Sequence, residues 1–559
     1  MFVREKRVGG KSYLQIVENS WVDGTVRQRV VHSLGRLDVL RERGELEGLV
    51  VSAGRFCEKV AVLSAHDKGQ SLVTRTRRIG PGLVFDRLRR DLGIGRAVED
   101  LVSGRKFGFA MERAVFLTVL HRLFASGSDR AAEVWKEDYE IAGARVLELH
   151  HLYRAMAWLG EPLGEERRYG SPRCVKDEIE EKLFGMRRDL FSNLDLVFFD
   201  TTSIHFEGEG GETLGRYGHS KDHRPDLKQM VVGVVLDDAG RPICSELVPG
   251  NTADVTALVP VVERLRREFS VNEVCVVADR GMVSKETVAR LESCAGMRYI
   301  LGARMRSTSE VTEEVLGRPG RYQEVHRRSA HERAPSPLKV KEVVVRGRRY
   351  IVCLNEDQAE KDRRDREAIV ELLREALKRG DKSLIGNRGY RRYVRASGTR
   401  FTVDTERIED EARYDGKWVL TTNTGLPAGE CALKYKQLWM VEAMFRSLKS
   451  LLETRPIYHR CDAAIRGHVF CSFLALVLRK EVQDRLEANG WRLEWADIMR
   501  DLDNLLETQI EINGKRYILR SEVKGTVGKV AQSCGVALPP VLRECGPPKK
   551  LGTRPFCES

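Results

Sequence analysis

Two short apolar runs that each carry an aspartate near their end constrain the fold of this chain more than any other feature. The first is Leu194–Asp200 (LDLVFFD), and the second is Val271–Gly281 (VNEVCVVADRG). Strands that are buried on both faces of a sheet have such near-continuous apolar sequences. We therefore expect Asp200 and Asp279 at the carboxyl ends of two neighbouring strands, in the crevice where open α/β sheets place their ligands.

The elements around these runs define a fold class. Gln229–Asp237 and Pro242–Gly250 have strand patterns, and Asp254–Phe269 has a helical pattern with Asp254 as a first-turn acid. A helix beginning at Ser284 and a strand in MRYILGAR follow. The order β-β-β-α-β-α-β is that of the ribonuclease-H-like fold, an α/β class with a mixed sheet and helices on its faces.

The stretch Tyr435–Lys449 (YKQLWMVEAMFRSLK) has its apolar residues at helical spacing, which predicts one amphipathic helix facing a core. Glu442 is a carboxylate among these apolar residues, and burying it is costly unless it has a function. Tyr435, Glu442 and Lys449 are spaced by seven residues, so they lie on nearly one stripe of the helix. Taken alone, a half-exposed glutamate on a surface helix is the simpler interpretation.

Three carboxylates brought to one site repel each other, and their pKa values rise unless a cation is bound. Asp200, Asp279 and Glu442 would suit magnesium, a hard ion that takes oxygen ligands. Two such ions about 4 Å apart can activate an attacking oxygen and stabilise the leaving oxygen in an in-line displacement at phosphorus. We therefore expect these acids to be both metal ligands and catalytic groups, with Mg²⁺ as the cofactor and Mn²⁺ as a substitute.

The charge balance favours a polyanionic partner. The chain has 95 Lys and Arg against 82 Asp and Glu, a formal net charge of +13 and a pI of about 9.1, and DNA or RNA is the simplest such partner. The sequence shows neither a membrane-length apolar run nor an N-terminal signal segment, so we expect an intracellular, cytoplasmic protein at the nucleoid. The 12 cysteines form no CxxC pair, which favours reduced thiols over a zinc site.

At 559 residues, the chain exceeds what one hydrophobic core normally serves. We expect a ribonuclease-H-like catalytic core with an inserted, mainly β subdomain, preceded by a small β hairpin and a helical N-terminal domain. The hairpin is centred on Asp23-Gly24 and carries Arg27, Arg29 and His32, on a strand that either contacts DNA or is a solvated face. The helical domain is either a DNA-binding module or a structural bundle. The expected boundaries are 1–75 for the hairpin and helical arm, 76–190 for the helical domain, 191–301 with 431–485 for the core, 302–430 for the insertion, and 486–559 for a C-terminal region with a hairpin and a loose tail.

Basic residues near the acids are candidates for DNA contacts. The loop Gly218–Gln229 carries five of them, His219, Lys221, His223, Arg224 and Lys228. This loop either binds the DNA backbone or is solvated. Arg280 follows the second acid and either contacts a phosphate or pairs with a carboxylate. In the insertion, Arg391 and Arg392 stand among tyrosines on which bases can stack.

These motifs together resemble the DDE insertion-sequence transposases of the insertion-sequence-four superfamily, whose third acid lies in a Y-x2-R-x3-E-x6-K signature. Tyr435, Glu442 and Lys449 match that signature, and Leu438 stands where the family usually has arginine. The segments VFFDTTS, VVADRGM, DGKWVLTTN, GHSKDHRPDLKQ and RPIYH are also similar to the family. The resemblance covers roughly residues 190–480 and extends more loosely to the N-terminal region.

The resemblance implies a magnesium-dependent DNA transposase that cleaves at the ends of its insertion sequence and joins the 3′-hydroxyl ends to target DNA. The three acids would hold two metal ions, and Tyr435 and Lys449 would contact the DNA backbone near the cut. Trp418 would stack on an extruded base, although a core position in its strand is the simpler interpretation. The implied partners are the terminal inverted repeats, target DNA and a second copy of the chain in a homodimer.

Two other functions remain compatible with the sequence. One is a ribonuclease-H-like, metal-dependent endonuclease that cuts without joining. The other is an inactive DNA-binding repressor derived from a transposase, and the presence of all three acids counts against it.

Overall fold

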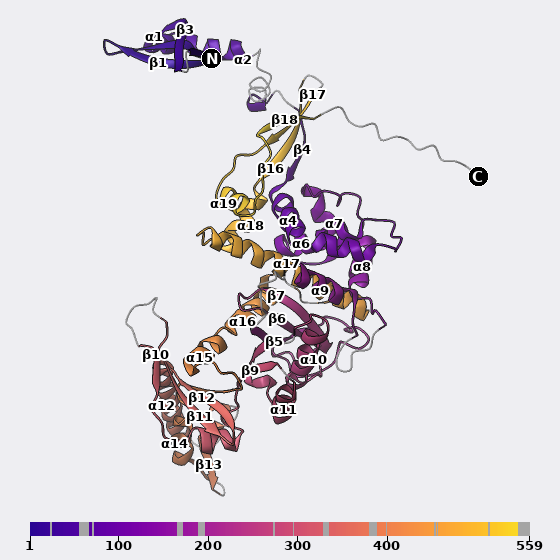
Figure 1. Cartoon of the computed structure of the whole chain (residues 1–559), viewed down its shortest axis with the longest axis vertical. Coiled ribbons are helices and arrows are strands. Elements are labelled where there is room, and N and C mark those ends of the chain that lie inside the picture. Colours follow the sequence, from indigo (N-terminus) through magenta and orange to yellow (C-terminus); the bar gives the residue numbers. More distant parts are fainter. Residues whose placement is uncertain are drawn as a thin grey trace, which may run out of the picture. The chain divides into compact units, whose positions relative to one another are not determined.

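The structure is a computed structural model that describes the chain except residues 23–24, 55–65, 70–71, 165–171, 188–195, 272–273, 295, 328–334, 380–387, 398–399, 452–453, 455–456, 513–514 and 546–559. The chain divides into two compact units, whose elements are labelled in Figure 1. One unit comprises Met1–Gly80, Arg500–Gly528 and Ala537–Ser559, and the other comprises Pro81–Met499 and Lys529–Val536. The second unit contains the three acids predicted from the sequence.

A nine-stranded mixed sheet organises this larger unit, in the order β10-β11-β12-β15-β9-β8-β5-β6-β7. The five strands of the expected core are β5 (Leu196–His205), β6 (Gln229–Leu236), β7 (Pro242–Pro249), β8 (Val274–Ala278) and β9 (Met297–Gly302). β5, β8 and β9 are parallel, whereas β5–β6 and β6–β7 are antiparallel pairs. Helices α10 (Asp254–Arg267) and α11 (Lys285–Ser293) follow β7 and β8. The mixed α/β class and the order of these elements are confirmed.

Strand β5 is longer than the sequence predicted, because it continues past Asp200 to His205. The continuation is buried from Thr201 to Ile204 and pairs with β6, with Thr201 opposite Gly233. Threonine fits a pleated sheet surface well, so the polar residues after Asp200 did not mark the end of the strand. Asp200 therefore lies within β5 and not at its carboxyl end.

Most strands of the insertion extend the same sheet. They are β10 (Gln323–His326), β11 (Leu338–Val345), β12 (Arg348–Leu354) and β15 (Lys417–Thr422), and β15 pairs with β9. β11 and β12 form a hairpin that turns at Arg346-Gly347, where both residues have the positive φ angles of a tight turn. The remaining elements are η3 (Glu310–Val315), α12 (Glu356–Lys378), α13 (Arg388–Arg391), the hairpin β13 (Val394–Ser397) and β14 (Arg400–Val403), and α14 (Thr405–Ala412). Because α12 alone has 23 residues, helix contributes substantially to this region.

A layer of helices packs beside the sheet around α17 (Asp462–Ala488), which contacts α6 (Met111–Phe124), α8 (Leu149–Leu159) and β7 (Figure 1). Residues 465–478 of α17 are all buried, as expected of a helix enclosed by other elements. The other helices of this region are α4 (Gly80–Asp91), α5 (Ile94–Val102), α7 (Asp129–Trp135) and α9 (Val175–Arg187).

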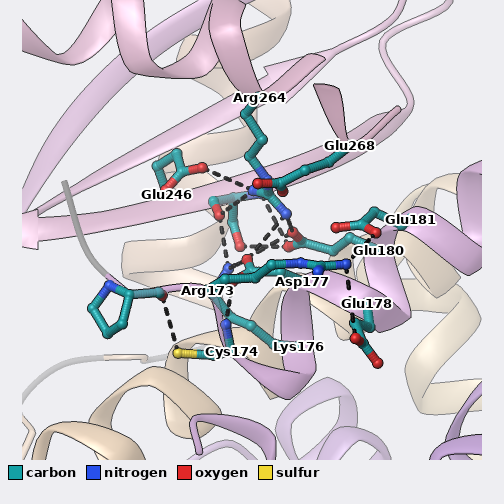
Figure 2. Close-up of polar contacts among 12 residues, drawn as sticks. Arg173, Cys174, Lys176, Asp177, Glu178, Glu180, Glu181, Glu246, Arg264 and Glu268 are labelled. Atoms are coloured by element: carbon teal, nitrogen blue, oxygen red, sulfur yellow. Dashed lines mark hydrogen bonds and ion pairs between the residues drawn. The ribbon is translucent and has the colours of Figure 1, made fainter. Parts of the chain in front are cut away.

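A buried ionic network joins α9 to α10 and β7 (Figure 2). Arg264 lies at its centre, 2.6 to 3.0 Å from carboxylate oxygens of Asp177, Glu180, Glu246 and Glu268. Lys176 adds a second cation, 2.6 Å from Asp177. The attraction between such charges offsets their loss of solvation only while the partners are all present. The network therefore fixes α9 to the sheet and to the helix that follows β7.

Arg264→Met should destabilise the protein strongly, because it leaves buried carboxylates without their main cation. We expect the free energy of unfolding, measured with denaturant, to fall by about 3–5 kcal/mol. Arg267→Met is the matched control on the same helix, since its side chain is 62% exposed and its ion pair with Glu268 should contribute about 0–1 kcal/mol. Equal losses in the two variants would contradict a stabilising function of the buried network.

His121 on α6 is buried, packs edge-on against Trp135 and precedes Arg122. Burial, together with the charge of Arg122, lowers its pKa to about 4. Because the unfolded chain takes up this proton at a pKa near 6.5, acid favours the unfolded state. The contribution of neutral His121 to stability is complete above pH 6.5 and is lost as the pH falls towards 4.

His121→Gln should therefore flatten the pH dependence of stability between pH 6.5 and 4. Within that window the wild type should lose up to about 1.4 kcal/mol per pH unit more than the variant, because it takes up one additional proton on unfolding. Denaturant unfolding at a series of pH values measures the difference. Parallel curves for the two proteins would show that His121 titrates normally.

The smaller unit contains two sheets. The first is antiparallel and consists of β1 (Phe2–Val8), β2 (Lys11–Val22) and β3 (Thr25–Arg36), followed by α1 (Leu37–Glu42) and α2 (Glu45–Gly54). The expected β2–β3 hairpin is confirmed, and its turn residues Asp23-Gly24 lie outside the described residues.

The second sheet has the order β18-β17-β16-β4 and joins distant parts of the chain. Its strands are β4 (Leu72–Arg78), β16 (Leu506–Ile512), β17 (Lys515–Arg520) and β18 (Leu542–Cys545), and α18 (Trp495–Asp503) and α19 (Val527–Ser533) lie nearby in the sequence. The C-terminal hairpin β16–β17 is confirmed, whereas its turn Asn513-Gly514 and the tail from Gly546 lie outside the described residues. The pairing of β4 with β16 was not predicted from the sequence.

Across the described residues, no helix combines the length and the apolar character that crossing a membrane requires. The cysteines described there form no disulfide.

Candidate active site

Asp200 and Asp279 lie beside each other on neighbouring strands. The parallel pairing of β5 with β8 ends at Phe199 opposite Ala278, and each aspartate is the next residue of its strand or of the turn that follows. The register of the two strands thus brings together two of the three acids predicted from the sequence.

The surroundings of Asp200 disfavour its negative charge. Burial is the largest influence on its pKa and raises it to about 6, while the Lys221 ammonium opposes that increase. The backbone N–H of Thr201, which donates to Asp200 Oδ1 at 2.7 Å, also opposes it, and the charges of Asp279 and Asp254 raise the pKa further. Carboxylates crowded in this way are stabilised by a bound cation.

Asp254, which sequence analysis noted only as a first-turn acid, belongs to the same group. It is the first residue of α10, and Thr201 Oγ1 donates to its Oδ1 at 2.7 Å. The directions of the strands could have predicted that Asp254 lies near the other acids. β7 runs parallel to β5 because the pairs β5–β6 and β6–β7 are both antiparallel. The helix after β7 therefore begins on the side of the sheet where parallel strands end.

Tyr435 Oη donates a hydrogen bond of 2.7 Å to Asp279 Oδ1. This approach requires Gly302 at the end of β9, where an added Cβ would lie 2.4 Å from the tyrosine hydroxyl. Burial and the charge of Asp279 raise the pKa of Tyr435, so its hydroxyl keeps its proton and acts as a donor. The structure therefore brings Tyr435 to the second acid.

The stretch Tyr435–Lys449 is not the single helix that the sequence predicted. It divides among α15 (Ala428–Lys436), α16 (Trp439–Arg446) and the π-helix η5 (Ser447–Leu451). At the first break, the N–H of Leu438 bonds to the carbonyl of Tyr435 in an i→i+3 pattern. Apolar spacing continues across both breaks, so periodicity could not reveal them. Tyr435, Glu442 and Lys449 therefore do not share one helical stripe.

Glu442 is exposed, which favours the simpler interpretation of a glutamate on a helix surface over a carboxylate turned toward a core. Its helix α16 buries Val441 and Phe445 and packs against β5 and β6. Among the described residues, the carboxylate oxygens of Glu442, Asp200 and Asp279 do not all lie within 4.8 Å of one another, the spacing expected of ligands that share one metal ion. Glu442 thus lies on a helix fixed to the strand of Asp200, with its carboxylate open to solvent.

Lys449 forms an ion pair of 2.8 Å with Asp222, in the loop between β5 and β6. The side chains are only 14% and 12% exposed, and His205 Nδ1 lies 3.7 Å from the second carboxylate oxygen of Asp222. The same loop is anchored by Asp462, the first residue of α17, which accepts backbone N–H groups from residues 212–214. The loop therefore holds the lysine of the predicted signature.

Asp222→Ala should destabilise the protein more than Asp226→Ala. It removes a charge-assisted hydrogen bond between largely buried groups, so the free energy of unfolding should fall by about 1.5–3 kcal/mol. Asp226 lies in the same loop, but its side chain and that of its partner Arg224 are 59% and 47% exposed, so solvent screens this ion pair and its loss should change stability little. Thermal unfolding compares the two variants, and an equal shift of Tm would contradict the difference in burial.

A cleft of about 220 Å³ is lined by the acid Asp254, by the cations Lys221 and Arg304, and by His219. Lys221 Nζ is 3.1 Å from Asp254 Oδ2, so a lysine that sequence analysis considered for the DNA backbone is engaged with an acid. Arg304, which sequence analysis missed, donates to the carbonyl of Gly281 at 3.1 Å. The cleft thus places Asp254 beside two positively charged side chains.

Other candidates for DNA contact have partners of their own. Arg224 pairs with Asp226 at 2.9 Å, and Lys228 donates to the carbonyl of Glu209 at 3.0 Å. Arg280 is exposed in the short turn after β8. Exposure leaves Arg224 and Arg280 accessible to phosphate, because surface ion pairs exchange partners at little cost.

The insertion residues remain predictions for DNA contact. Arg392 lies 3.7 Å from Glu411, and the side chain of Arg391 lies outside the described residues. Trp418 is half-buried on β15, and Lys436 Nζ lies 5.6 Å from the centre of its ring.

Asp129, His459 and His468 form a second cluster of potential ligands, with one atom from each within 4.8 Å of the others. Arg122 already supplies a cation there, with Nη2 3.0 Å from His468 Nδ1 and 4.0 Å from Asp129 Oδ1. Burial and the charge of Arg122 hold the pKa of His468 well below its usual value. A guanidinium in this position opposes a second cation, so the cluster fits a structural function.

Comparison with known families identifies the family of the chain. A family model described as "Transposase DDE domain" matches residues 192–478, just over half of the 559 residues, and one described as "IS1634 family transposase, N-terminal domain" matches residues 3–66. The protein belongs to the DDE transposase family. No curated protein matches the chain.

Among solved structures, the chain is similar to the "Mos1 transposase paired-end complex with left transposon end". The sequence identity is 14% and the TM-score is 0.14, and the match covers 36% of this chain and 64% of that chain. With so low a TM-score, the fold assignment rests on the chain's own topology.

Proposed function

We propose that the protein is a DNA transposase of the insertion-sequence-four superfamily, which cleaves DNA at the ends of its insertion sequence and joins the 3′-hydroxyl ends to target DNA. The observation that carries this proposal is the adjacency of Asp200 and Asp279, inside the segment that matches the DDE domain. Tyr435, Glu442 and Lys449 would form the signature, with Leu438 buried at the position of its arginine. The terminal repeats and the target DNA would be the partners of a homodimer.

The donor set fits a hard divalent cation. Asp200, Asp279 and Glu442 offer carboxylate oxygens, the ligands that Mg²⁺ prefers, and Mn²⁺ would substitute. Burial and neighbouring acids raise the pKa of Asp200, and a bound cation would relieve that cost. Two bound ions would activate the attacking oxygen and stabilise the leaving oxygen at the scissile phosphate.

The chain's own side chains would orient these ligands and the DNA. Tyr435 restricts rotation of the Asp279 carboxylate through its hydrogen bond. Lys449 would release Asp222, its partner in the structure, and bind a DNA phosphate in its place. Arg280 would add a further phosphate contact directly after the second acid, and each neutralised phosphate would add salt-dependent affinity.

Glu442→Gln tests this proposal with a labelled duplex carrying the DNA that flanks the gene, in the presence of Mg²⁺. The wild type should nick the duplex and then form joined products. The variant should lose both by at least about a hundredfold, because a metal ligand contributes several kcal/mol to the reaction. DNA binding should survive, since the exposed Glu442 supports no core packing.

Glu430→Gln is the matched control, because Glu430 is a 47% exposed glutamate on the preceding helix α15. It should leave nicking and joining unchanged. Nicking by the wild type without joined products would identify an endonuclease instead. Binding without any cutting, in Mg²⁺ or in Mn²⁺, would identify a repressor.

A further inference from the structure

A lysine ammonium lies among the acids of the proposed active site. Lys221 Nζ donates to the carbonyl oxygen of Thr201 at 2.7 Å and to Thr201 Oγ1 at 3.0 Å. It is also 3.1 Å from Asp254 Oδ2 and 4.0 Å from Asp200 Oδ1. The four groups around this cation thus present only oxygen atoms.

The loop geometry fixes Lys221 in this place. The backbone N–H of Lys221 donates to Ser203 Oγ at 2.8 Å, which ties the loop to the strand that carries Asp200. Ser220 is buried, and its hydroxyl accepts the N–H of Asp222 at 3.3 Å and of Arg224 at 3.1 Å. Hydrogen bonds within the protein, from the loop to β5 and within the loop, therefore hold Lys221 in position.

The ammonium of Lys221 reduces the electrostatic repulsion between the neighbouring carboxylates. Like charges on Asp200 and Asp254 repel each other in a partly buried site, and an ammonium between them reduces that repulsion. A divalent cation that binds Asp200 must share the same negative charge with Lys221. The ammonium and a divalent cation bound to the same carboxylate would repel each other, so the presence of one would weaken binding of the other.

We propose that Lys221 is a positioning residue: it is the built-in counter-ion of Asp200 and Asp254 in the metal-free protein, and it competes with the divalent cation. The inference rests on the proposed function, because it concerns the same acids. The cleft of about 220 Å³ that Lys221 lines offers space for the ammonium when a cation binds. Lys221 is thus occupied by acids, and not by DNA, before the metal arrives.

The test compares Mn²⁺ affinity, measured by calorimetric titration of the full chain without DNA. Lys221→Met should bind Mn²⁺ about tenfold more tightly than the wild type, because the competing charge is absent. Lys221→Arg keeps the charge and should stay within about threefold of the wild type. Lys228→Met is the matched control for loss of a loop lysine, since Lys228 contacts the carbonyl of Glu209, and it should not change Mn²⁺ affinity.

A second measurement separates this inference from a direct phosphate contact. In EDTA, Lys221→Met should bind the duplex as tightly as the wild type, with the same dependence on salt. Unchanged Mn²⁺ affinity, together with weaker DNA binding and a salt slope reduced by about one, would overturn the inference and make Lys221 a phosphate ligand. If Lys221→Met does not fold, Lys221→Gln replaces it, as a neutral side chain that can still donate to Thr201.

Asp200→Asn distinguishes failure of the inference from failure of the proposed function. If Asp200→Asn binds Mn²⁺ as tightly as the wild type, Asp200 holds no metal, and both the proposed metal site and the inference are overturned. If Asp200→Asn loses Mn²⁺ while Lys221→Met behaves as the wild type, the inference alone is overturned.

Discussion

The parallel pairing of β5 with β8 is the interaction on which the candidate site depends. It sets two aspartates of like charge beside each other, where burial disfavours the charge of Asp200. Much of the nearby structure compensates for their repulsion. Tyr435 donates to one carboxylate, the N–H of Thr201 donates to the other, and Lys221 supplies a positive charge. These contacts reduce the electrostatic cost of placing the two carboxylates side by side.

The order of strands and helices in the core could be predicted from the sequence because it depends on local patterns. Apolar runs marked β5 and β8, and the N-cap serine Ser284 marked the start of α11. The extension of β5 beyond Asp200 could not be predicted in this way, since buried threonines there are stabilised by pairing with a distant strand. The pairing of β4 with β16 could not be predicted either, because the two strands are far apart in the sequence. The breaks around α16 were hidden because apolar residues keep helical spacing through them.

The charged residues of the site were found from the sequence, but their partners were not. Lys221 and Lys449 were both interpreted as cations for DNA, and in the structure each pairs with an aspartate. Arg264 lies among other arginines at the end of α10, where a solvent-exposed side chain would be expected. In the structure it is instead buried and paired with four carboxylates. A charge in a sequence indicates that a partner is needed, and only the tertiary structure decides whether that partner belongs to the chain.

The pairing of β15 with β9 has a consequence for how the gene for such a protein can change. The chain leaves the core after β9 and returns beside it, where the N–H of Ala303 donates to the carbonyl of Val419 at 2.8 Å. Exit and re-entry therefore adjoin, and the cost of closing the excursion between them grows only slowly with its length. Changes of sequence within that excursion can accumulate while α16 stays packed on β5 and β6, which lie outside it, whereas α15 also contacts β11 and β12 of the insertion. Variation in the insertion therefore need not displace Glu442, because its helix α16 rests on core strands.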